Sequence, residues 1–139
     1  MIEVHQLSKR YGTVQAVRDV SFQVGTGQVI GLLGPNGAGK TTIMKILTGY
    51  HYPTSGSALI DGLSVEEYPE EVKKRIGYLP ENAPSYGDLS PLEYLSFVAE
   101  ARAIPKDKRA SRIKQVMDQC SLQEVKNKSI ETLSKGYRQ

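Results

Sequence analysis

The feature that most constrains this chain is a glycine-rich run between two apolar segments. The run fits the pattern G-x-x-x-x-G-K-[ST] and consists of Gly34, Pro35, Asn36, Gly37, Ala38, Gly39, Lys40, Thr41 and Thr42. Residues 29–33 before it are apolar or glycine, as in a strand buried on both faces. After it, one helical stripe is formed by Ile43, Met44, Ile46 and Leu47. A strand, a phosphate-binding loop and a helix in this order predict a parallel α/β sheet.

The residue types in this run suit a nucleoside triphosphate. Glycines let the backbone turn and approach a ligand closely, so that a row of N–H groups forms an anion-binding nest. The helix that starts near Lys40 adds the positive end of its dipole. Lys40 is expected to reach the β- and γ-phosphates, and the Thr41 hydroxyl to coordinate Mg²⁺. An ordinary glycine-rich turn is the alternative, but four fixed positions rarely coincide by chance.

Composition excludes several function classes. The 139 residues suffice for one domain with a core, and the net charge of +3 is too small to indicate nucleic-acid binding. Cys120 is the only cysteine, which rules out an internal disulfide and fits a reduced, cytosolic setting. No signal peptide is expected after Met1, and the longest apolar stretch, 29–33, is too short to span a membrane. We therefore expect no direct membrane insertion.

Periodicity divides the chain into a strand-rich part and a helical part. Strands are expected at 2–8, 16–24, 29–33, 57–60, 63–65 and 76–80, and helices from near 40 to a stop at Gly49 and at 66–75, 90–102 and 105–120. Asp61 and Gly62 predict a tight hairpin turn. Ser90, Pro91 and Glu93 combine an N-cap, a proline at N1 and a capping box. We expect a nucleotide-binding core over residues 1–84 and a helical subdomain over 85–139.

The order of these features resembles the ATP-binding subunit of ABC transporters, over the whole chain. Apart from the glycine-rich loop, the most specific element is the segment Leu133-Ser134-Lys135-Gly136-Tyr137-Arg138-Gln139. It is similar to the family's signature segment, which usually begins Leu-Ser-Gly-Gly-Gln, whereas taken alone it would more often be a helix-capping turn. The resemblance implies a P-loop NTPase core, with a mixed sheet and antiparallel N-terminal strands, plus an inserted α-helical subdomain.

In this family two ATP-binding subunits meet head to tail, and the signature of one closes over the γ-phosphate held by the other. The resemblance therefore implies that Ser134, Lys135 and Gly136 contact the nucleotide in trans. Ser134 supplies a hydroxyl, and Gly136 lets its backbone N–H approach the phosphate. Lys135 and Tyr137 depart from the commonest pattern, and Lys135 adds a cation near the γ-phosphate.

The resemblance also assigns roles outside the two motifs. Tyr11 matches the aromatic residue that stacks on adenine, and Val17 adds an apolar contact to the base; core packing is the alternative for Tyr11. Glu81 stands where the family has its lid glutamine, which implies contact with Mg²⁺ and the attacking water. Lys40 and Glu81 are the two candidate catalytic residues of the chain. Glu81 and Lys135 together are similar to exporter subunits of the drug-efflux and gliding-motility kind.

Past the signature, the family continues with an apolar strand ending in Asp-Glu and with a switch histidine. Neither is in this chain, so the resemblance implies an incomplete fold, no general base, and ATP hydrolysis only in the complete protein. Without the missing strand, residues 29–33 are expected to expose an open edge and to cause aggregation.

The function implied is ATP binding and hydrolysis that drive export through a separate membrane-spanning permease subunit. The expected place is the cytoplasm, at the inner face of the cell membrane through that partner. A non-transport ABC protein of translation or DNA repair stays open as an alternative, as does a binding-only remnant of a truncated gene.

Overall fold

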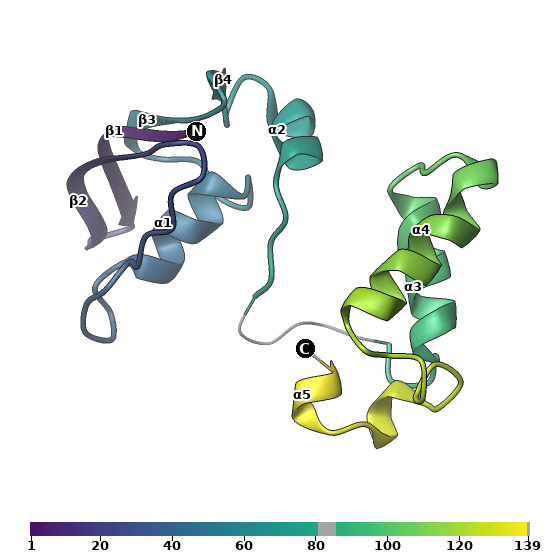
Figure 1. Ribbon diagram of the computed structural model, residues 1–139. Coiled ribbons are helices and arrows are strands. Elements are labelled where there is room, and N and C mark those ends of the chain that lie inside the picture. Colours follow the sequence, from purple (N-terminus) through teal and green to yellow (C-terminus); the bar gives the residue numbers. More distant parts are fainter. Residues whose placement is uncertain (81–85, 139) are drawn as a thin grey trace. The chain divides into compact units, whose positions relative to one another are not determined.

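The computed structural model describes residues 1–80 and 86–138 (Figure 1). The chain divides into two compact units, Met1–Tyr78 and Leu79–Gln139. Each unit contains its own cluster of buried apolar side chains. The boundary expected between residues 84 and 85 lies outside the described residues.

The first unit is built on an antiparallel sheet with the strand order β2-β1-β3-β4. The strands are β1 (Ile2–Tyr11), β2 (Val14–Val24), β3 (Ser55–Ile60) and β4 (Leu63–Ser64). Asp61 and Gly62 have φ angles of 49° and 78°, as the tight turn between β3 and β4 requires. The predicted N-terminal antiparallel strands and the predicted hairpin are therefore confirmed.

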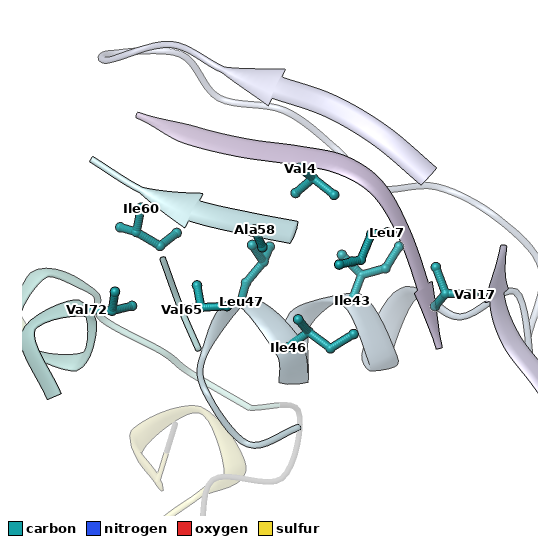
Figure 2. Packing of buried hydrophobic residues seen from close by; sticks show 10 residues of the cluster. All are labelled: Val4, Leu7, Val17, Ile43, Ile46, Leu47, Ala58, Ile60, Val65 and Val72. Atoms are coloured by element: carbon teal, nitrogen blue, oxygen red, sulfur yellow. The ribbon is translucent and has the colours of Figure 1, made fainter. Parts of the chain in front are cut away.

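The core of this unit lies between the sheet and helix α1 (Lys40–Leu47). Figure 2 shows its ten buried side chains, which are Val4, Leu7, Val17, Ile43, Ile46, Leu47, Ala58, Ile60, Val65 and Val72. Helix α2 (Pro69–Arg75) contributes the last of them. Met44 is exposed, so its predicted place on the buried stripe is wrong. Gly49, with a φ of 75°, follows the last turn of α1 as predicted.

Two predicted strands, 29–33 and 76–80, are wrong for this structure. Residues 28–35 form neither helix nor strand, and Val29 and Leu33 are 98% and 92% exposed. Residues 76–80 also lack strand pairing, and Leu79 is 64% exposed. A strand exists only where its N–H and C=O groups meet a neighbouring strand. None of the described strands pairs with either segment, so hydrophobicity alone did not decide their structure.

The second unit is helical. Its elements are α3 (Pro91–Ala101), α4 (Lys106–Gln119), the short 3₁₀ helix η1 (Ile130–Thr132) and α5 (Lys135–Arg138). The predicted capping box opens α3, because Ser90 Oγ accepts from the Glu93 N–H at 3.3 Å and Glu93 Oε2 accepts from the Ser90 N–H at 2.8 Å. The Ser90 backbone N–H, and after it the Ser90 hydroxyl, which donates to Glu93 Oε2 at 2.7 Å, lower the pKa of Glu93.

Hydrogen bonds join the segment before α3 to the segment that contains η1. The Ile130 N–H donates to the Leu89 carbonyl at 2.9 Å, and Ser129 Oγ donates to the Gly87 carbonyl at 2.7 Å. Leu133, at the end of this stretch, is buried with two neighbours in the second apolar cluster. The backbone that leads to residues 134–136 is therefore fixed to the start of α3.

Candidate functional site

The glycine-rich loop lies on the surface of the first unit and runs directly into α1. Residues 34–38 are exposed, and the Ala38 N–H donates to the Pro35 carbonyl at 3.2 Å, which closes a turn. Gly39 is the N-cap of α1, and the first turn of that helix carries no acidic side chain. The positive end of the helix dipole is therefore not neutralised from within the helix, which suits a bound anion.

Lys40 bends back over this loop. Its Nζ donates to the Gly34 carbonyl at 2.6 Å and to the Pro35 carbonyl at 2.7 Å. The ammonium charge is thus held at the loop itself, as a phosphate-binding lysine requires. A phosphate oxygen would be a stronger, charge-assisted acceptor than these neutral carbonyls. The ammonium can therefore replace its hydrogen bonds to the loop carbonyls with hydrogen bonds to a phosphate.

Two loop glycines are required for different reasons. Gly37 is required for its backbone conformation alone, because its φ is 81° and a Cβ at this position would meet open space. Gly39 has a φ of 88°, and a Cβ there would lie 2.3 Å from the Ala16 carbonyl oxygen and 3.0 Å from Val17 Cγ2. The second glycine therefore lets the loop lie against β2, a packing role that the sequence motif alone does not show.

Thr41 is the predicted Mg²⁺ ligand that lies within the described residues. It is exposed in the first turn of α1, beside Lys40, and its hydroxyl oxygen is the kind of ligand that this hard cation prefers. Within residues 1–80 and 86–138, no three His, Cys, Asp or Glu side chains are grouped to hold a metal. Glu81, the other predicted ligand, lies outside the described residues.

The two predicted base contacts differ in accessibility. Tyr11 ends β1 and is 41% exposed, with its ring in contact with His51 and Lys9. Val17 is 3% exposed and belongs to the buried core cluster, so little of its surface is open to a ligand. Its contact with a base stays a prediction.

Lys9 and His51 are neighbours of the candidate site that the sequence interpretation did not include. Lys9 could have been found, because residues two apart on a strand share a face. Nothing in the sequence pattern joins His51 to Tyr11, since it is the fold that brings the segment after α1 to the end of β1.

The signature-like segment belongs to the second unit. Ser134, Lys135 and Gly136 are exposed at the start of α5, while Leu133 before them is buried. Ser134 Oγ accepts from the Tyr137 N–H at 3.4 Å. The three residues are open to a partner molecule. Gln139, the last residue of the predicted segment, lies outside the described residues.

Several known proteins resemble this chain over most of its length. A family model described as ABC transporter matches residues 17–139. The chain is 31% identical, over all its 139 residues, to a protein of Escherichia coli named "Probable multidrug ABC transporter ATP-binding protein YbhF", of which it spans 24%. A solved structure described as the ATP binding subunit of an ABC transporter has a TM-score of 0.83 and 29% identity, and the match covers 97% of this chain and 56% of that one.

A second solved structure, a dimeric bacterial ABC transporter cassette, has a TM-score of 0.84 at 22% identity and is covered over 65% of its length. This likeness concerns the fold alone. Together with the family match, these likenesses confirm the predicted P-loop NTPase fold. The described strands pair only in antiparallel fashion, however, so the predicted parallel pairing is not formed among them, because neither segment 29–33 nor segment 76–80 has a partner strand. No helix in the described part of the chain combines the length and apolarity needed to cross a membrane.

Proposed function

The chain belongs to the ABC transporter family, and from this premise we propose that it binds Mg·ATP at residues 34–42 as part of an ATPase that drives transport. The observation that carries the proposal is the loop geometry. The Lys40 ammonium lies 2.6 and 2.7 Å from two loop carbonyls, next to the unneutralised N-terminus of α1.

Each residue of the site has a proposed task. Backbone N–H groups of the loop and the N-terminus of α1 bind the phosphate oxygens, and Lys40 stabilises negative charge on the β- and γ-phosphates. Tyr11 presents its ring to adenine, with Val17 as the proposed lesser contact. Thr41 and Glu81 would hold Mg²⁺, which when bound neutralises phosphate charge.

Hydrolysis is proposed to need a second ATP-binding subunit. Ser134, Lys135 and Gly136 of one subunit would cover the γ-phosphate on the other, since their exposure leaves them open to a partner. Neither motif supplies a general base, and Glu81 is proposed to orient the attacking water. We therefore expect this chain by itself to bind ATP without steady turnover.

The direction of transport and the partner are also proposals. The E. coli relative is named for multidrug transport, which supports export through a separate permease subunit at the inner face of the cell membrane. Co-purification with a membrane protein that has several spans would support this assignment. A partner in translation or DNA repair would instead favour the non-transport alternative.

Titration with Mg·ATP tests the binding site directly. Lys40→Ala is expected to weaken ATP binding at least about 10-fold, because charge-assisted hydrogen bonds to phosphate are lost. Lys45→Ala, on the last turn of the same helix, is the matched control and should bind as the wild type does. Equal affinities of all three proteins for ATP would refute the proposed site.

A further inference from the structure

The ring of Tyr11 has two side-chain neighbours that nucleotide binding alone does not explain. The His51 ring packs on it in a T-shaped arrangement, with centroids 5.7 Å apart and ring planes at 74°. The Lys9 ammonium lies over the Tyr11 ring, 5.2 Å from its centroid. With 41% of Tyr11 still exposed, these contacts restrain the ring and leave part of it accessible.

Both neighbours are themselves anchored. The His51 backbone N–H donates to the Lys45 carbonyl in the last turn of α1, at 3.1 Å, which fixes the main chain that carries the imidazole. Lys9 Nζ donates to the Tyr52 carbonyl at 2.7 Å, so the ammonium is held between β1 and the segment after α1. The Lys9 ammonium and the main chain of His51 are therefore both fixed near the ring.

The segment after α1 is also fixed to β1 through Thr54. Its N–H donates to the Ser8 carbonyl at 2.8 Å, and its Oγ1 accepts from the Arg10 N–H at 3.0 Å. The surroundings of Tyr11 thus depend on the segment that follows α1, the same helix that begins with Lys40. Phosphate loop and aromatic ring are connected through one short helix.

We propose that His51 and Lys9 are positioning residues that hold the Tyr11 ring ready for the adenine base. The inference rests on the proposed function, in which Tyr11 stacks on that base. A tyrosine free to change rotamer would lose entropy when the base binds, and this loss weakens affinity. The T-shaped contact and the cation–π contact favour one ring orientation before the nucleotide arrives.

The test compares Mg·ATP with inorganic tripolyphosphate, which has no base, on the full gene product. His51→Ala and Lys9→Met should each weaken ATP binding by about 2- to 12-fold and leave tripolyphosphate binding unchanged. His51→Phe keeps a ring contact and Lys9→Arg keeps a cation, so both should retain wild-type affinity. His5→Ala, an exposed histidine elsewhere on β1, is the matched control.

A double variant separates positioning from a general structural role. In a Tyr11→Ala background, His51→Ala should cause no further loss of ATP affinity, because there is no ring left to hold. A further loss in that background, an equal loss of tripolyphosphate binding, or an unchanged ATP affinity in the single variant would each overturn the inference. If Tyr11→Ala and Lys40→Ala leave ATP binding intact, the proposed function fails as well. Thermal melts of every variant verify folding.

Discussion

Gly39 shows how one missing side chain connects the phosphate loop to the sheet. The position is N-cap of α1, and the Ile43 N–H donates to its carbonyl at 2.9 Å. On the other side its Cα faces the Ala16 carbonyl so closely that no Cβ fits. The orientation of the first helical turn is therefore set by contact with β2.

Gly39→Ala should thus be more damaging than Gly37→Ala. Both substitutions place an alanine at positive φ, which costs about 1–3 kcal/mol, but only the first also forces a clash. We expect Gly39→Ala to have the lower free energy of unfolding and to weaken Mg·ATP binding at least about 10-fold. Urea unfolding and ATP titration of both variants measure the difference, and equal effects would contradict the packing role.

Helix α3 illustrates an element whose start is decided locally. Ser90 and Glu93 form three hydrogen bonds with each other within four residues, so the sequence alone could predict where this helix begins. The same holds for the Asp61–Gly62 turn. The segment 29–33 is different, because a strand of this kind needs partners that are distant in sequence. Its apolar composition favours a strand, but no described strand pairs with it, so none forms.

The capping box predicts a pH dependence. The hydrogen bonds from Ser90 lower the folded-state pKa of Glu93, so its carboxylate stabilises the fold above the ordinary glutamate pKa. That stabilisation is lost as the pH falls through the lowered value. The unfolding free energy of wild type relative to Glu93→Gln should therefore decrease between neutral pH and pH ~3. Urea unfolding at several pH values measures it.

Glu124→Gln, an exposed carboxylate elsewhere in the same unit, is the matched control for this experiment. A difference between wild type and Glu93→Gln that stays constant over the whole pH range would show that the capping carboxylate is not the titrating group.

At the scale of the whole molecule, the exposed segment before the phosphate loop stands out. Val29 and Leu33 are almost fully exposed, and Ile30 is half exposed. Residues 28–35 have no strand pairing among the described residues, so their unpaired backbone groups and apolar side chains are open to other chains. We expect this 139-residue chain, expressed by itself, to aggregate, as the sequence interpretation already predicted.

Charged substitutions test this expectation. Val29→Lys together with Leu33→Lys should raise the soluble fraction of this chain, because lysines on an exposed apolar edge oppose association. Val14→Lys together with Tyr50→Lys, which replaces two exposed apolar side chains elsewhere, controls for added charge. Sedimentation and light scattering of the three proteins measure the effect. Equal gains in both double variants would show that segment 29–33 is not the cause.

Some residues of the candidate site could be predicted from the sequence, and others could not, because their contacts form only in the folded chain. A contiguous motif such as residues 34–42 carries its chemistry in its residue order, so its place beside α1 follows directly. His51, by contrast, comes from the segment after α1, and its contact with Tyr11 depends on the packing of α1 against the sheet. Pattern analysis reaches the first kind of residue and not the second.

The hydrogen bonds between residues 87–89 and 129–131 have a mechanical consequence. Because the chain before α3 and the turn ahead of Ser134 are attached to each other directly, displacement of one displaces the other. A force applied at the N-terminus of α3 would therefore be transmitted to residues 134–136 through these hydrogen bonds, and not along the length of α3 or α4.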